Sequence, residues 1–100
     1  MLDFARIVGF DWDDGNARKS LDKRGVSQPE AEQVFADERI LIADDISHSE
    51  TENRYQALGK TLADRHLHVS FTLRRERTLI RVISARDMNR KERRRYESQA

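Results

Sequence analysis

The residues best suited to chemistry lie near the C-terminus, where Arg86 follows an apolar run and a basic cluster comes next. The cluster consists of Arg90, Lys91, Arg93, Arg94 and Arg95. An arginine side chain offers a planar fork of donors that suits phosphate or carboxylate oxygens. We therefore expect Arg86 to bind an anionic group. The cluster would supply positive potential for a polyanion or an acidic protein partner.

The residues before Arg86 predict the rigid element that holds it. Residues 78–84 are mostly apolar and β-branched, which favours a strand inside a sheet and not at its edge. Residues 67–73 alternate regularly between apolar and polar types, so a second strand should turn its apolar side chains inward. On this pattern His66 and His68 are surface residues. The short connection 74–77 makes the two segments an antiparallel hairpin.

The first half of the chain predicts one strand and two short helices. Residues 4–12 alternate loosely, with Val8, Phe10 and Trp12 on one side, and indicate a strand in which Phe10 and Trp12 are core anchors. Capping residues at 13–16 predict a helix that ends near Arg24, with Gly25 as its stop. Residues 27–30 have the spacing of a capping box and predict a second helix. The buried stripe of that second helix is Ala31, Val34 and Phe35.

Further strands are expected over residues 39–43 and 55–62, separated by an acidic loop that holds His48. Residues 89–92, from Asn89 to Glu92, have the spacing of a capping box and residues 84–87 resemble one; we prefer a basic helix that begins after Asn89. Because that helix is polar nearly all round, we expect it to dock only lightly through Met88 and Tyr96, or to be held by a partner. The order of elements predicts an α+β domain, with two helices packed on one face of an antiparallel sheet and a C-terminal basic helix.

Composition limits the class of protein. One hundred residues indicate a single domain, 1–100. The net charge of +1 hides a balance of +6 in residues 74–100 and of −5 in residues 1–73. The absence of cysteine excludes disulfides and thiolate metal sites, and no Asp/His cluster has metal-ligand spacing. Since no apolar run spans a bilayer and no leader is visible, we expect a cytoplasmic protein without membrane, metal or cofactor.

Several short motifs occur in one order along nearly the whole chain. They are residues 10–14, 23–27, 30–31, 34–35, 44–45 with His48, Arg54 with 58–59, 83–86 and 92–96. In this combination the sequence resembles the BrnT toxins of type II toxin–antitoxin systems. The resemblance implies a fold similar to RelE-type toxins and a stress-response ribonuclease that inhibits translation by cutting RNA. It also implies a BrnA-like antitoxin, whose complex with the toxin binds its own promoter DNA. The resemblance leaves open whether the protein forms a homodimer or a dimeric toxin–antitoxin assembly.

Cleavage of an RNA backbone without a metal needs a base for the 2′-hydroxyl, positive charge on the phosphate and an acid for the leaving oxygen. Arg86 is our choice for the phosphate clamp, with Arg74 or Arg75 at the hairpin as a second cation. The family motif Lys-His-Gly reads Lys23-Arg24-Gly25 here. Lys23 matches, but Arg24 cannot replace the histidine as a base, since its pKa stays above about 12.

Two other side chains carry alternative roles. His48 matches a family histidine and is either a hydrogen-bond partner in the acidic loop or a catalytic group. Tyr96 is either a proton donor or the anchor of the last helix. The residues expected to bind RNA or a partner are Arg24, Arg75, Arg90, Lys91, Arg93 and Arg94. Two functions remain open at this stage: an endoribonuclease toxin, or a non-catalytic module that binds protein or nucleic acid.

Overall fold

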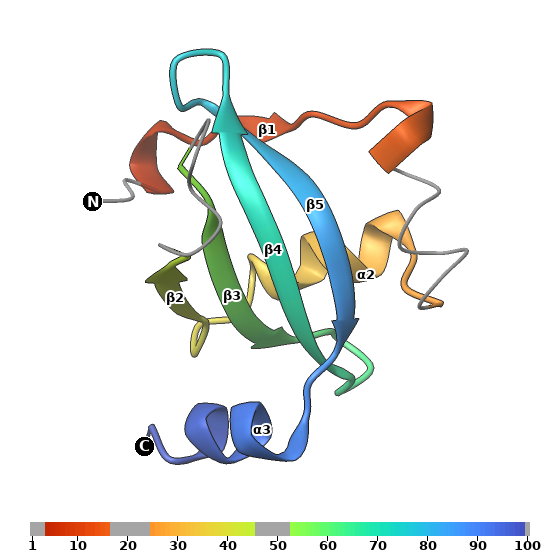
Figure 1. Ribbon diagram of the computed structural model, residues 1–100, viewed down its shortest axis with the longest axis vertical. Helices are drawn as coiled ribbons and strands as arrows, with labels where there is room; N and C mark the ends of the chain where they lie inside the picture. The colour runs from red at the N-terminus through yellow and green to blue at the C-terminus, as the bar shows by residue number, and fades with distance from the viewer. Residues whose placement is uncertain (1–3, 17–24, 46–52, 100) are drawn as a thin grey trace.

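The computed structural model describes residues 4–16, 25–45 and 53–99 (Figure 1). These residues form one five-stranded sheet with the order β1-β5-β4-β3-β2. The strands are β1 (Gly9–Phe10), β2 (Leu41–Asp44), β3 (Tyr55–Lys60), β4 (His66–Arg74) and β5 (Leu79–Asp87). The helices are the 3-10 helix η1 (Phe4–Arg6), α2 (Gln28–Val34) and α3 (Arg90–Glu97). None of these described helices is long and apolar enough to cross a membrane.

The sheet is mixed, so the predicted purely antiparallel sheet is wrong in one pairing. Strands β2, β3, β4 and β5 pair antiparallel with their neighbours, whereas β1 runs parallel to β5. The position of β5 inside the sheet, between β1 and β4, is confirmed. The direction of β1 depends on pairing with a strand at the other end of the chain, and alternation within a segment carries no information about that partner.

The first strand is much shorter than predicted. Residues 4–6 form η1, and only Gly9 and Phe10 pair with β5. Val8 is 80% exposed, so the residue does not face the core as the alternation suggested. Phe10 is confirmed as a core anchor: it stacks on Trp12 and meets Phe35 edge-on, with ring centroids 6.5 and 5.6 Å away.

Helix α2 covers one face of the sheet, and it lies behind the sheet in Figure 1. Its capping box is confirmed, since Ser27 Oγ accepts from the Glu30 backbone N–H and the Glu30 carboxylate accepts from the Ser27 N–H. A Cβ at Gly59 of β3 would lie 2.8 Å from Val34 Cγ1, so the glycine permits close helix–sheet contact. The core beneath α2 consists mainly of Ala31, Val34, Ala57, Leu67, Val69, Phe71, Ile80 and Val82.

The hairpin of β4 and β5 is confirmed as antiparallel. Its turn places three consecutive residues, Arg75, Glu76 and Arg77, at positive φ, although none of them is a residue type that favours this conformation. A bulge between Ser70 and Phe71 shifts the register midway along the hairpin. Strand β2 begins two residues later than predicted, at Leu41. The predicted first helix falls mostly on residues 17–24, which lie outside the described part of the chain.

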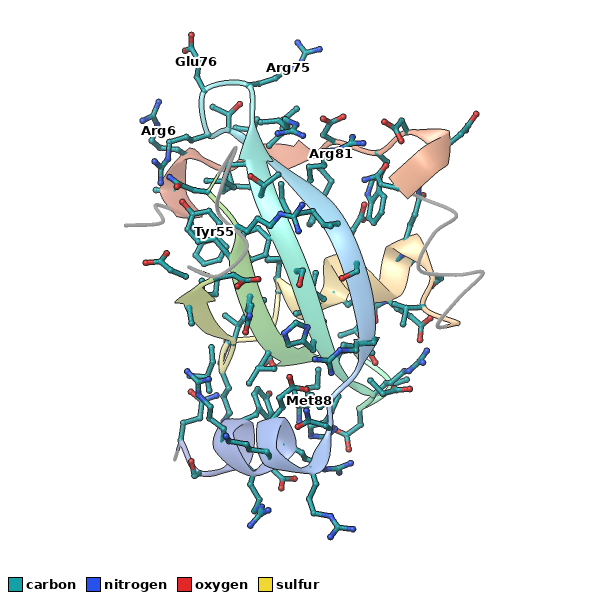
Figure 2. All side chains as sticks on the ribbon, in the orientation of Figure 1. Arg6, Tyr55, Arg75, Glu76, Arg81 and Met88 are labelled. Carbon is teal, nitrogen blue, oxygen red and sulfur yellow. The ribbon has the colours of Figure 1, made fainter. Side chains whose placement is uncertain are left out.

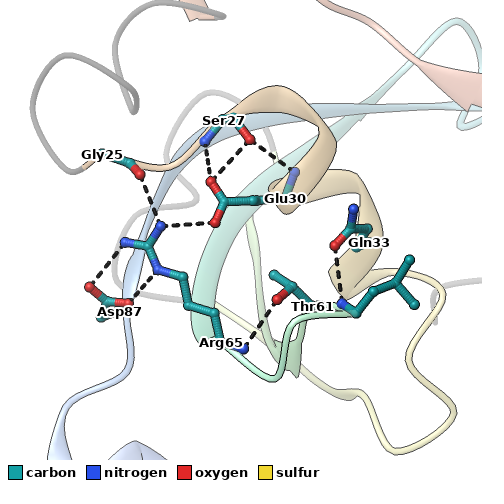
Figure 3. Close-up of polar contacts among 8 residues, drawn as sticks. Gly25, Ser27, Glu30, Gln33, Thr61, Arg65 and Asp87 are labelled. Carbon is teal, nitrogen blue, oxygen red and sulfur yellow. Dashed lines mark hydrogen bonds and ion pairs between the residues drawn. The ribbon is translucent and has the colours of Figure 1, made fainter.

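The end of β5 is fixed by Arg65, which sequence reasoning did not single out. Figure 3 shows the guanidinium between Asp87, Glu30 and the carbonyl of Gly25. Its Nε and Nη2 donate to the two Asp87 carboxylate oxygens at 2.8 and 3.1 Å, and its Nη1 donates to Glu30 at 3.0 Å. The contact joins the last residue of β5 to the first turn of α2. Arg86, one residue earlier, therefore starts from an anchored backbone.

Candidate active site

Arg86 and His68 are direct neighbours across the β4–β5 hairpin. The register pairs these two residues, so their side chains leave the same face of the sheet. Their alternation with Val69 and Ala85, both in the core, places them on the face opposite α2. The prediction that Arg86 lies at the end of a central strand is thus confirmed, because it is the next-to-last residue of β5. Strand β5 continues through Asp87, three residues past the predicted end of the apolar run.

The guanidinium of Arg86 is held by an ion pair within the chain. Nη1 and Nη2 donate to the two oxygens of the Glu92 carboxylate at 2.8 and 2.9 Å, and Nη1 also donates to the Asp87 carbonyl at 3.1 Å. One third of the Arg86 side chain, 33%, is still exposed to solvent. The arginine that we expected to bind an anionic group is therefore oriented by a carboxylate of the same chain and remains partly open to solvent.

His68 is buried, so its interpretation as a surface residue is wrong. It is 6% exposed, and Nε2 lies 3.9 Å from a Glu92 carboxylate oxygen. Burial, followed by the nearby Arg86 charge, lowers the pKa of His68 below its ordinary value, against the smaller opposing effects of Glu92 and Asp45. The ring is therefore neutral at pH 7.

Glu92 connects this pair to α3. Its carboxylate accepts from the Asn89 backbone N–H at 2.9 Å, and the Asn89 side chain accepts from the Glu92 N–H, so the predicted capping box is confirmed. The hydrogen bond from Arg86 is the largest cause that lowers the pKa of Glu92 to about 2. The carboxylate is consequently ionised at pH 7 and well into the acid range.

Tyr96 anchors α3 to the body of the protein. It is 5% exposed, its ring meets His66 edge-on at 5.5 Å, and its hydroxyl donates to Asp37 at 2.5 Å. Burial and the hydrogen bond to Asp37 raise the pKa of Tyr96 to about 12. The expected contact through Tyr96 is present, but α3 is also tied down by Glu92 and Arg86. The docking is thus firmer than the polar sequence of the helix suggested.

The other predicted residues are distributed over the molecule. Arg74 and Arg75 lie at the far end of the hairpin, and Figure 2 shows Arg75 and Met88 at opposite ends of the view. Arg74 is six residues along β4 from His68, about 20 Å at the usual rise of a strand. A single phosphate cannot contact both Arg74 and Arg86. Lys23, Arg24 and His48 lie outside the described residues.

The basic side chains of α3 form an exposed surface beside the site. Every residue of this basic helix surface is exposed: Arg90, Lys91, Arg93, Arg94 and Arg95. Arg93 makes an ion pair with Glu97 at 3.4 Å, in which both side chains are more than half exposed. Such a pair contributes little to stability and leaves the surface strongly positive. The helix therefore places a cationic surface next to Arg86 and His68.

The site contains two residues that sequence reasoning missed in this role. Glu92 was recognised only as a capping residue, and His68 only as the polar side of a strand. Pairing along the hairpin is the one signal that could have placed His68 beside Arg86, but the bulge after Ser70 shifts that register by one residue. Within the described residues, no three His, Asp or Glu side chains are grouped to hold a metal ion.

The geometry defines a small α+β protein whose candidate site combines an oriented arginine, a neutral histidine and a basic helix surface. Such a site suits a phosphodiester better than an uncharged ligand. The family model described as "Ribonuclease toxin, BrnT, of type II toxin-antitoxin system" matches residues 12–92. The chain therefore belongs to the BrnT family of ribonuclease toxins. A comparison with curated proteins found no match.

Proposed function

We propose that this BrnT-family member is an endoribonuclease that cleaves RNA without a metal ion, with Arg86 and His68 at the reacting phosphate. The observation that supports the proposal most directly is the pairing of these two side chains across β4 and β5, on a face that α2 does not cover. A fixed cation and a neutral imidazole are two of the groups that metal-free cleavage of a phosphodiester requires.

In the proposed reaction, His68 accepts the proton of the RNA 2′-hydroxyl as the 2′-oxygen attacks phosphorus. Arg86 donates hydrogen bonds to the phosphate oxygens, on which negative charge builds up in the transition state. The bond between phosphorus and the 5′-oxygen then breaks, which leaves a 2′,3′-cyclic phosphate, and the 5′-oxygen takes up a proton from a general acid or from water. The family resemblance also predicts that Lys23 and His48 take part in this reaction. Tyr96 is a weaker candidate for the acid, because its hydroxyl already donates to Asp37.

The remaining cations extend the RNA-binding surface in this proposal. The basic helix surface contacts phosphates next to the cleaved bond, whereas Arg74 and Arg75 contact the strand about 20 Å away. Arg24 stays a predicted member of the surface.

Membership in a type II toxin–antitoxin family implies an antitoxin partner. We propose that this partner is a BrnA-like protein that covers the basic helix surface with acidic side chains, and that the complex binds promoter DNA. Cleavage of RNA in the cytoplasm would inhibit translation. The family resemblance also predicts a fold similar to that of RelE-type toxins. Charge complementarity supports this arrangement, because residues 74–100 carry a balance of +6.

The decisive experiment incubates the purified protein with RNA in excess EDTA and follows the size of the RNA. The expected result is cleavage that persists in EDTA and leaves 2′,3′-cyclic phosphate ends, since the 2′-oxygen is the nucleophile. RNA that lacks the 2′-hydroxyl should stay intact. Binding without cleavage, weakened steeply by salt, would contradict the proposal and would instead indicate a non-catalytic RNA-binding module.

A further inference from the structure

We propose that Glu92 is a positioning residue, which orients Arg86 so that the Nε–Nη2 edge of its guanidinium is the edge that binds the RNA phosphate. The inference rests on the proposed ribonuclease function and assigns a role within that site. It is drawn from the way in which the donors of Arg86 are distributed among their partners.

A guanidinium carries five N–H groups: one on Nε and two on each terminal nitrogen. In Arg86, one N–H of Nη1 and one of Nη2 point to the Glu92 carboxylate, and Nη1 also donates to the carbonyl of Asp87. Within residues 4–16, 25–45 and 53–99, no acceptor bonds the Nε–H or the second Nη2–H. These two parallel N–H groups form one edge of the fork, which matches two phosphate oxygens.

The surroundings of Glu92 explain how it can act as a fixed support. Its side chain is only 19% exposed, and the Asn89 backbone N–H holds one of its oxygens. The carboxylate is therefore tied to the first turn of α3 before any substrate arrives. An arginine held at two nitrogens loses less freedom when it binds a phosphate, which favours the transition state.

The proposal is opposed by an obvious alternative, in which Glu92 competes with the phosphate for Arg86. The two roles predict opposite signs for Glu92→Gln. Removal of a negative charge next to the substrate strengthens RNA binding in either case. If Glu92 competes, the cleavage rate rises as well. If Glu92 positions Arg86, the rate constant of the chemical step falls although the RNA binds at least as tightly.

The test measures kcat and KM for RNA cleavage by wild type, Glu92→Gln and Glu97→Gln. Glutamine keeps the capping oxygen at residue 92, so α3 can still form. Glu97→Gln is the matched control, because it removes the same charge from the same helix and also releases an arginine, Arg93. We expect Glu92→Gln to lower kcat by roughly 10- to 100-fold without raising KM, and Glu97→Gln to leave kcat unchanged. An unchanged or higher kcat for Glu92→Gln would overturn the proposal.

A binding measurement separates this inference from the proposed function. The NMR signal of the Arg86 Nε–H is followed while an RNA analogue with 2′-deoxy positions, which cannot be cleaved through a 2′-oxygen, is added. In wild type this signal should shift and exchange more slowly with solvent, and in Glu92→Gln the shift should be absent or much reduced. If wild type shows the shift but cleaves no RNA in EDTA, the proposed reaction fails while the positioning role stands. If the Nε–H signal does not respond to RNA in wild type, the positioning role fails.

Discussion

The Arg86 guanidinium and the Glu92 carboxylate form a two-point ion pair, with hydrogen bonds of 2.8 and 2.9 Å, that joins the end of β5 to the first turn of α3. The ion pair gives the basic helix a defined place beside the sheet. It also separates the functions of two kinds of arginine. Arg86 is oriented at a rigid strand, whereas the basic helix surface offers solvated charges.

Replacement of Arg86 should lower catalysis much more than binding. For Arg86→Ala we expect cleavage to fall by about 100-fold or more, comparable to the loss of one oxyanion donor. Arg86→Lys keeps the charge but loses the fork, so its rate should also fall clearly below wild type. Single-turnover cleavage of a labelled RNA measures both variants. A rate equal to wild type for Arg86→Ala would remove Arg86 from the site.

Cleavage should depend on pH through His68. The base must be neutral, and burial together with Arg86 lowers its pKa below the ordinary 6.5. The rate should therefore stay constant as pH falls from 7 to the ordinary histidine pKa of 6.5, and should fall only at lower pH, as the imidazole takes up a proton. The negative charge of Asp45 also acts on the His68 ring. Glu92, whose pKa is about 2, stays ionised over this range. A pH profile of kcat for wild type and for His68→Gln gives the test; a wild-type rate for His68→Gln would exclude His68 as the base.

The stability of the folded protein at acid pH should depend on whether Glu92 is ionised. Its pKa is about 2 in the folded protein and about 4.5 in the unfolded chain, so the folded state is favoured above pH 4.5. This contribution disappears as pH falls from about 4.5 to about 2. Thermal unfolding of wild type and Glu92→Gln should therefore differ most above pH 4.5 and converge near pH 2. A difference in Tm that does not change with pH would show that the ion pair adds no stability.

Tyr96→Phe distinguishes an anchor from a proton donor. The variant removes the hydrogen bond to Asp37 but keeps the buried ring, so unfolding should require about 1.5–3 kcal/mol less free energy. Cleavage by the folded variant should stay within about twofold of wild type. A proton donor would instead contribute about 10²- to 10⁴-fold to the rate. Urea unfolding and single-turnover cleavage, measured below the unfolding transition, give both values.

The basic helix surface should affect RNA binding and leave the chemical step unchanged. The double variant Arg93→Gln, Arg94→Gln should raise KM and reduce the dependence of RNA binding on salt. For single-stranded RNA the slope of log K against log salt should fall by about 0.7 for each phosphate that the variant no longer neutralises. The value of kcat should not change. An unchanged salt slope would place the RNA away from α3.

Local patterns in the sequence predicted much of the fold. The capping boxes at Ser27 and Asn89 involve residues three positions apart, so their signal is contained within one helical turn. The strands β4 and β5 follow from alternation and from a continuous apolar run. The position of Arg86 at the end of a central strand follows from the same patterns. These features depend on residues that are close together in the sequence, so the sequence alone can indicate them.

Tertiary structure alone decided what surrounds that arginine. The approach of Glu92 to His68 requires α3 to fold back against the sheet, and the Arg86–Glu92 ion pair requires the same path of the chain. The parallel pairing of β1 and the anchoring of Asp87 by Arg65 join segments far apart in sequence. A side chain's type and spacing specify what it is able to bind. Which partner it meets is set by strand register and packing across the whole domain, because only these bring distant segments within hydrogen-bond distance.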